Sequence, residues 1–196
     1  MKWVYLLIHC NLDVMRFFVG IILSNEGPHV IVVEHKLGIS MSILKPMFGY
    51  VVPELHRLRL LLNDSPHEEL VLRIDKVSLA ALLVKGDFPP ALDIRKSLIT
   101  QKLLCARQEI RLTGVIFSKH PKSPSCWYHR KWCLNFLQAT TDLTIASIIS
   151  EECNICQRMC EVYPRNYYSW NHRLWIAQHM SCDQVSRPSK YHMTQT

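Results

Sequence analysis

Long apolar runs are missing from this 196-residue sequence. The two apolar stretches near the N-terminus, residues 3–8 and 17–23, are separated by polar and charged residues. Neither approaches the ~20 residues that a membrane-spanning helix requires, so we expect no membrane span. A cleavable signal peptide stays an alternative for the N-terminus, because Lys2 precedes a short apolar stretch.

Glycine and long runs of basic residues are also scarce. The chain has 6 glycines and 20% charged residues against 48% hydrophobic residues, which argues against extensive disorder and allows a buried core. The net charge is +7, but lysine and arginine are scattered in small groups. Polar residues suited to reading RNA bases do not recur at fixed repeat positions either. We therefore expect no nucleic-acid partner.

The 8 cysteines do not indicate a disulfide framework, because no convincing secretory pattern accompanies them. Cys153, Cys156 and Cys160 have the i, i+3, i+7 spacing of a helix core stripe. With His172 and His179 downstream, they also provide ligand types that zinc accepts. However, a structural zinc site usually places its cysteine pair on a turn, and no glycine is nearby. The sequence therefore predicts no metal site in this chain and a reduced, cytoplasmic protein.

Proline and glycine divide the chain into segments of helix length. Residues 65–68 resemble a capping box with proline at the first helical position, and helical apolar spacing follows up to Val84, before Gly86. Residues 28–34 are the best strand candidate. Between residues 99 and 117 no clear breaker marks a helix boundary. Further helices are predicted from Pro89, from 143 to about 162, and from about 167 to 180.

An internal repeat is the most informative feature of the sequence. Residues 121–132 and 164–175 both begin with proline, reach tryptophan six residues later, and continue as W-x-H-R-x-W, with the two copies 43 residues apart. A degenerate copy at residues 87–98 has Leu92 in place of the tryptophan. A motif built from such rare residues does not recur by chance. Its period predicts a solenoid of helix pairs.

The residues of the motif are first of all candidates for the scaffold. On a helix, Trp127 and Arg130 share one face, whereas His129 and Trp132 lie nearly opposite. Each indole buries a large apolar area, and the arginine can donate charge-assisted hydrogen bonds to helix ends or acidic groups. The predicted scaffold positions are Trp127, His129, Arg130, Trp132, Trp170, His172, Arg173 and Trp175.

The repeat resembles that of the protein prenyltransferase α subunits, whose pattern is P-x-N-Y-x-x-W-x-H-R-x-W. Residues 164–175 match it almost throughout, whereas residues 121–132 have Ser123 and Pro124 in place of the Asn-Tyr pair. The resemblance implies an all-α fold, a right-handed α–α superhelix of stacked helical hairpins. The expected organisation is a segment of uncertain structure at 1–27, helical repeats over 28–180 and a polar tail at 181–196. Because family α subunits generally carry more repeats than the three found here, we expect a truncated array.

The resemblance also implies a function. In the family, the α subunit wraps around a β subunit that supplies the catalytic zinc and most of the isoprenoid pocket. The assembled enzyme transfers a farnesyl or geranylgeranyl group from its diphosphate to a cysteine near the C-terminus of an acceptor protein. This chain is then expected to be an α-type transferase subunit, inactive alone and without a cofactor of its own. Its expected partners are the β subunit, the prenyl diphosphate and the acceptor protein.

Three positions correspond to family residues that approach the diphosphate. The family's lysine corresponds to Lys122, its tyrosine to Tyr167, and the histidine that follows to Tyr168. Tyr168 could donate a hydrogen bond but could not carry a positive charge. The alternative is a non-catalytic helical-repeat adaptor that binds a partner protein. Retention of Lys122 favours the enzyme subunit, whereas the replaced Asn-Tyr pair favours the adaptor.

Overall fold

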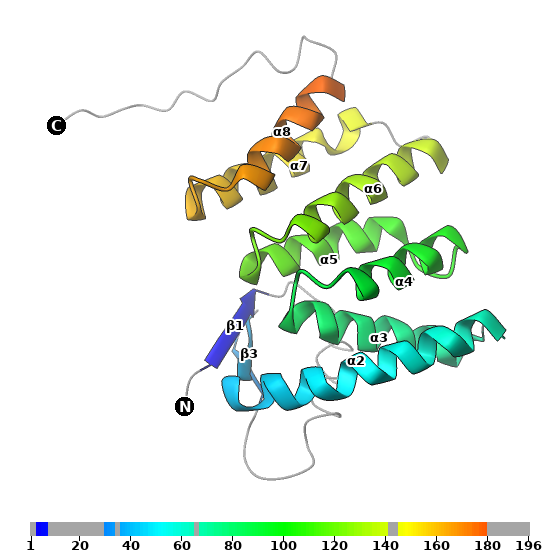
Figure 1. Cartoon of the computed structure of the whole chain (residues 1–196). Helices are drawn as coiled ribbons and strands as arrows, with labels where there is room; N and C mark the ends of the chain where they lie inside the picture. The colour runs from blue at the N-terminus through cyan, green and yellow to red at the C-terminus, as the bar shows by residue number, and fades with distance from the viewer. Residues whose placement is uncertain (1–2, 8–29, 34–35, 65–66, 141–144, 180–196) are drawn as a thin grey trace.

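Helical hairpins form most of the structure, a computed structural model that describes residues 3–7, 30–33, 36–64, 67–140 and 145–179. The elements in chain order are β1 (Trp3–Leu7), β2 (Val30–Val33), β3 (Lys36–Ser40), α2 (Met41–Asp64), α3 (Glu68–Val84), α4 (Pro89–Thr100), α5 (Ala106–Lys119), α6 (Pro124–Thr140), α7 (Ile145–Val162) and α8 (Tyr167–His179). The helices stack into an elongated array (Figure 1). The predicted solenoid of stacked helical hairpins is therefore confirmed.

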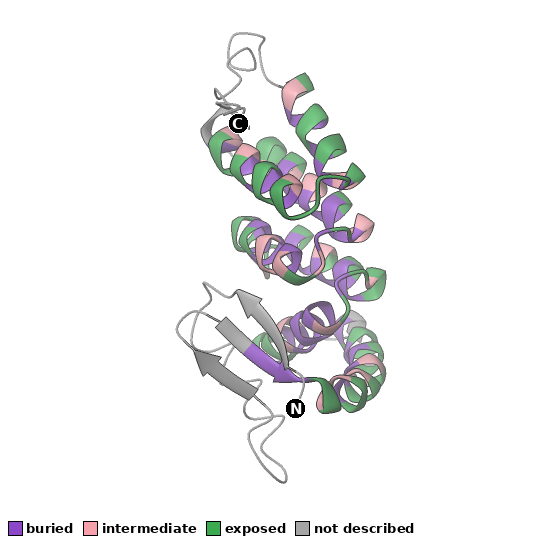
Figure 2. Cartoon of the chain, turned by 90° about the vertical axis from the view of Figure 1, so that its left-hand side faces the viewer, coloured by how far each residue is buried: buried purple, intermediate pink, exposed green. Residues whose placement is uncertain are grey.

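The repeats are the hairpins α3–α4, α5–α6 and α7–α8. Their second helices, α4, α6 and α8, lie side by side in one layer, and α3, α5 and α7 form the other layer (Figure 1). The turns within the three hairpins lie at the same edge of the array and are joined by hydrogen bonds. Apolar side chains fill the space between the layers, while the outward faces of the helices are exposed (Figure 2). Equivalent positions of the sequence repeat thus occupy equivalent places in space.

Helix α2 was not predicted, because Pro46 and Pro53 lie inside it. Proline in a helix interior removes a backbone hydrogen bond and costs about 3 kcal/mol. That cost is offset by an apolar stripe that packs on α3. The buried members of the stripe are Met47, Val51, Leu55, Leu58 and Leu62.

The boundary that the sequence did not reveal lies at residues 101–105. Helix α4 ends at Thr100, and Lys102 takes a left-handed conformation with φ of 61°. Its N–H donates to the Ile99 carbonyl, which closes the turn. Glycine usually fills such a position, so a lysine gave no signal of the helix end.

Gly86 lies in the turn between α3 and α4, where the α5–α6 turn approaches closely. A Cβ atom added there would lie 2.6 Å from the Cβ of His120 in the α5–α6 turn. Glycine therefore allows the two turns to pack directly against each other. Helix α3 ends at Val84, so the predicted helix end before Gly86 is confirmed.

A small antiparallel sheet precedes the helices, with the strand order β1-β3-β2. Tyr5 pairs with Gly38, and Val32 pairs with Leu37. Strand β2 lies within the predicted strand at residues 28–34, and β1 contacts α5. Most of the segment 1–27 and all of the tail 181–196 lie outside the described residues, so those two expectations stay predictions. Within the described part of the chain, no helix is both long and apolar enough to span a membrane.

Candidate functional site

Lys122 lies in the turn between α5 and α6 and is exposed. Its ammonium group is 5.1 Å from the ring centroid of Tyr163, in the α7–α8 turn. Among the described residues, no carboxylate lies within ion-pair distance of Lys122. The charge of this lysine is thus available to an anion from outside the fold.

The turn that carries Lys122 is fixed from both sides. The Pro121 carbonyl accepts a hydrogen bond from Trp127 Nε1 at 2.8 Å and another from Asn166 Nδ2 at 2.8 Å. On the other side, Ser123 Oγ donates to the Gly86 carbonyl at 3.0 Å. The backbone beside Lys122 is therefore held by the preceding and the following hairpin.

Ser123 has the same role in its repeat as Asn166 has in the next one. Each side chain bonds a backbone carbonyl of the preceding turn and also accepts an N–H from the first turn of its own helix. The Cys126 N–H donates to Ser123 Oγ at 3.2 Å, and the Ser169 N–H donates to Asn166 Oδ1 at 3.4 Å. The replacement of Asn by Ser in the second repeat therefore keeps both contacts.

An open depression of about 320 Å³ lies over these turns. It is lined by Asp87, Lys119, His120, Pro121, Lys122, Ser123, Pro124 and Tyr163. Asp87 Oδ1 accepts the backbone N–H of Ser125 at 3.2 Å, so this carboxylate serves the start of α6. Burial lowers the pKa of His120, which makes its ring neutral at neutral pH. The positive charges of the depression are those of Lys119 and Lys122.

The two predicted tyrosines lie elsewhere. Tyr167 is exposed, and its ring meets that of Tyr168 edge-on at 5.8 Å. Tyr168 is half-buried and lines a separate pocket of about 50 Å³. The other residues of that pocket are Trp127, Tyr128, Lys131, Asn171, His172 and Trp175. Lys122 and Tyr168 thus line two different hollows on neighbouring hairpins.

Trp127 fills the space between the second and third repeats. It is 4% exposed and stacks on Phe117 of α5, with a centroid distance of 4.0 Å. On its other side it contacts the ring of His172, at 5.1 Å. Trp127 of α6 therefore packs against both α5 and α8.

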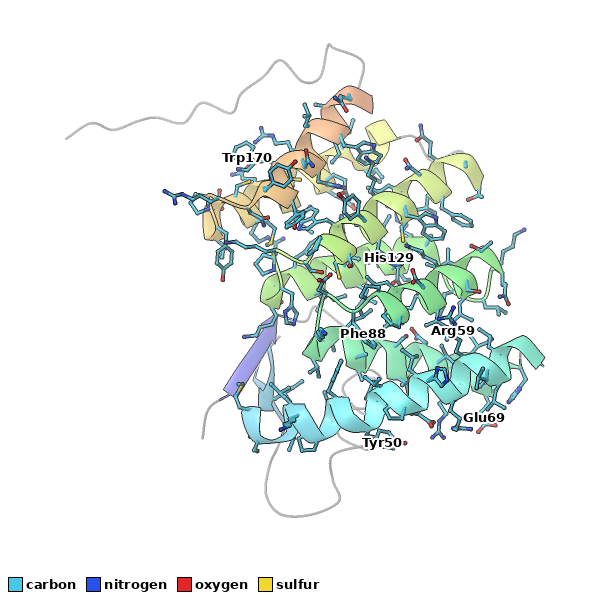
Figure 3. The ribbon with its side chains drawn as sticks, in the orientation of Figure 1. Tyr50, Arg59, Glu69, Phe88, His129 and Trp170 are labelled. Atoms are coloured by element: carbon cyan, nitrogen blue, oxygen red, sulfur yellow. The ribbon has the colours of Figure 1, made fainter. Side chains whose placement is uncertain are left out.

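A buried ion network links the first repeat to the second. Arg95 of α4 donates to both carboxylate oxygens of Glu109 on α5 and to Ser78 Oγ on α3. His129 Nε2 of α6 lies 2.8 Å from Glu109 Oε1 and donates to it. His129 Nδ1 is buried and has no hydrogen-bond partner among the described residues. His129 lies inside the stack (Figure 3).

The same network recurs one repeat later. Arg130 of α6 binds both carboxylate oxygens of Glu152 on α7 and also donates to Thr113 Oγ1 on α5. His172 Nε2 of α8 lies 2.9 Å from Glu152 Oε2. Arg95 and Arg130 thus each bind a glutamate on the first helix of the next hairpin, and the histidine of that hairpin binds the same glutamate.

Sequence reasoning missed the two glutamates. Glu109 and Glu152 are 43 residues apart, which is the spacing of the two W-x-H-R-x-W copies. This shared spacing was the feature of the sequence that could have identified the two glutamates. It was hard to use, because the neighbouring residues of α5 and α7 do not resemble each other.

Acid should destabilise the protein in two steps. Burial lowers the pKa of His172, so stability should begin to fall as the pH drops below the usual value of 6.5. Burial alone would raise the pKa of Glu109, but the charge of Arg95 and the His129 hydrogen bond outweigh it and lower the pKa from 4.5 to about 2. The stability from this carboxylate is full above pH 4.5 and is lost toward pH 2. Urea unfolding across this range measures both steps, and a constant free energy of unfolding from pH 6.5 to 4.5 would contradict the first.

The sequence-family model of the protein prenyltransferase alpha subunit repeat matches residues 106–137 and 149–180 of this chain. These ranges cover most of the hairpins α5–α6 and α7–α8 and contain both W-x-H-R-x-W copies and both glutamates. The chain carries two copies of the protein prenyltransferase alpha subunit repeat. The resemblance found in the sequence is therefore confirmed.

The chain is also similar to curated members of this family. It is 32% identical over 174 residues to protein prenyltransferase alpha subunit repeat-containing protein 1-A of Xenopus laevis, covering 80% of this chain and 38% of the relative. Identity to repeat-containing protein 1 of Homo sapiens is 32% over 172 residues, or 80% of this chain and 42% of that protein. The protein of the same name in Danio rerio is 30% identical over 173 residues, with 80% and 39% covered. The chain thus spans about two fifths of the length of these relatives.

The three cysteines of α7 are buried or partly buried in the stack of helices. Cys156 is buried in α7, Cys153 and Cys160 are partly buried, and Cys160 Sγ lies 3.1 Å from Ser169 Oγ on α8. All six cysteines in the described part of the chain are free thiols. Burial raises the pKa of Cys156 to about 12, so it is a protonated packing residue.

Proposed function

We propose that this chain is an α-type subunit of a heterodimeric protein prenyltransferase. It would support the transfer of a farnesyl or geranylgeranyl group from its diphosphate to a C-terminal cysteine of an acceptor protein. The observation that carries the proposal is Lys122, an exposed lysine without a carboxylate partner among the described residues, on a turn fixed by both neighbouring hairpins. A cytoplasmic location belongs to the same proposal.

The chemistry of the leaving group explains why such a lysine matters. As the bond between carbon and oxygen breaks, negative charge grows on the diphosphate, and a preorganised cation stabilises it. Lys122 and Lys119 supply two such charges in the open depression. The β subunit is expected to contribute the zinc that lowers the pKa of the acceptor thiol. This chain would bind that subunit and position the cations.

Replacing Lys122 with Ala should lower the rate of prenyl transfer by an assembled heterodimer roughly 100- to 1000-fold. Helix content and binding of the β subunit should stay unchanged, because the side chain is exposed. The test is co-purification with candidate β subunits, followed by transfer of labelled farnesyl or geranylgeranyl diphosphate to an acceptor. The isolated chain should show no transfer.

Lys45→Ala is the matched control, since it removes one exposed positive charge from α2, outside the depression. It should leave the rate unchanged, and Lys122→Arg should retain more activity than Lys122→Ala. An active heterodimer that tolerates Lys122→Ala without loss of rate would exclude the assigned role of Lys122. A chain that binds no β subunit would exclude the enzyme subunit itself.

The second candidate is a non-catalytic adaptor with the same solenoid. It is favoured by the separation of Lys122 from Tyr168, which line different hollows, and by the tyrosine at a position where the family has histidine. An adaptor would bind its partner equally well with lysine or alanine at position 122. Because the enzyme subunit should also bind its β subunit with alanine at position 122, binding alone does not distinguish the two candidates. The transfer assay on the co-purified complex distinguishes them, since only the enzyme subunit supports transfer.

A further inference from the structure

The third repeat has the tryptophan and the arginine of the motif, but neither has the burial that its position has in the other two repeats. The tryptophan position is 2% exposed as Leu92 in the first repeat and 4% exposed as Trp127 in the second. In the third repeat, Trp170 is 49% exposed, although the sequence repeat predicts the same burial. The cause is its position on α8, the last described helix of the stack, where Figure 3 places its ring on the outer side.

Arg173 differs from its equivalents in the same way. Arg95 and Arg130 are 5% and 3% exposed, and each binds a glutamate from the first helix of the next hairpin. Arg173 is exposed, and within the described part of the chain no carboxylate contacts it. Its guanidinium lies 5.8 Å from the Trp170 ring centroid instead. Among the described residues, Arg173 therefore lacks the glutamate partner that Arg95 and Arg130 have.

A backbone acceptor repeats as well. The Gly86 carbonyl accepts from Ser123 of the next hairpin, and the Pro121 carbonyl accepts from Asn166 of the next hairpin. The equivalent carbonyl of Pro164 accepts the indole N–H of Trp170 at 3.2 Å. No described residue of a following hairpin donates a hydrogen bond to this carbonyl.

The exposed groups lie on one face of α8. Tyr167, Trp170 and Leu174 are 69%, 49% and 56% exposed and follow the i, i+3, i+7 spacing of a helix stripe. Figure 2 shows exposed residues along the end of the stack that contains α8. Of these three positions, only that of Trp170 is buried between the other repeats, where Leu92 and Trp127 occupy it.

We infer that this face of α8 is the docking surface for a further helical hairpin of the same repeat type. The first helix of that hairpin presents a glutamate to Arg173, and the residue before its second helix donates a hydrogen bond to the Pro164 carbonyl. Its apolar side chains cover Trp170. This occupant is favoured because both internal interfaces of the array use the same three contacts. The greater length of the curated relatives is consistent with it.

A duplication within the full chain tests the inference. A second copy of residues 138–180 is inserted after Met180, ahead of the natural residues 181–196. The insertion has the 43-residue period that separates Glu109 from Glu152, so the copied glutamate falls where Arg173 requires it. The measurements are the helix content by circular dichroism, the midpoint of thermal unfolding, and the solvent isotope shift of fluorine-labelled Trp170 in NMR spectra.

The expected results separate this contact from general stabilisation. The inserted hairpin should add helix content, raise the unfolding midpoint and protect Trp170 from solvent. Arg173→Ala should lower the midpoint of the extended chain by several degrees and leave that of the natural chain unchanged. Glu152→Gln, made in the inserted copy alone, should reproduce the effect of Arg173→Ala in the extended chain.

Four outcomes would overturn the inference. In the first, the insertion becomes helical but Trp170 stays accessible and Arg173→Ala acts equally in both chains. In the second, the insertion stays unfolded, although the same sequence folds on the α5–α6 hairpin as α7–α8. In the third, Trp170 of the natural chain is already protected, which would assign the surface to the chain's own C-terminal residues. Sedimentation that changes with concentration would instead assign it to a second copy.

Discussion

Glu152→Gln should lower the free energy of unfolding by about 3–5 kcal/mol. The carboxylate is 1% exposed and lies between the guanidinium of Arg130 and the ring of His172. The amide is of similar size but neutral, so Arg130 would remain buried without a counter-charge. Breaking a buried pair by removing one partner is costly for this reason. Urea unfolding monitored by circular dichroism gives the difference.

Glu161→Gln is the control for this change, because it makes the same substitution on the same helix at an exposed position. Its cost should be below about 1 kcal/mol. Equal midpoints and slopes for the two variants would show that the buried network does not stabilise the stack. A loss confined to Glu152→Gln would show that the network between repeats is a main support of the fold.

Trp127→Ala should cost about 3–5 kcal/mol of unfolding free energy. The indole is 4% exposed, stacks on Phe117, and donates its N–H to the Pro121 carbonyl. Its loss opens a cavity between two hairpins and leaves that carbonyl with one hydrogen bond fewer. Thermal and chemical melts of the purified variant measure the effect.

Trp170→Ala is the matched comparison, since the two tryptophans hold the same place in the repeat. With Trp170 49% exposed, the cost in this chain should be well under half of that for Trp127→Ala. The equivalence of the two copies in sequence predicts equal costs. Coinciding melts for the two variants would therefore contradict the structure and support the simple repeat argument.

Much of the fold could be predicted from local signals. Proline and glycine mark the ends of the repeat helices, and the recurring W-x-H-R-x-W motif identified the stacked hairpins. Two elements escaped for local reasons. Helix α2 contains two prolines and is held by its packing on α3, and the turn after α4 uses Lys102 where glycine is usual.

The candidate site was predicted less completely than the fold. Lys122 was found through the motif, and the structure places it on an exposed, fixed turn. The sequence did not indicate that Tyr168 would line a different hollow, because that depends on how α6 and α8 pack. It also did not indicate Glu109 and Glu152, since a glutamate on an amphipathic helix usually faces solvent.

The sequence by itself determined the type of repeat, its period and the residues that each copy carries. Those properties depend on the order of residues along the chain, so they can be read without coordinates. Only the tertiary structure decided what each copy contacts. Arg130 is neutralised because a hairpin follows it, whereas the identical Arg173 is exposed on α8, the last described helix. The physical reason is that burial and charge pairing are properties of an interface between repeats, and an interface exists only where a neighbouring hairpin is in place.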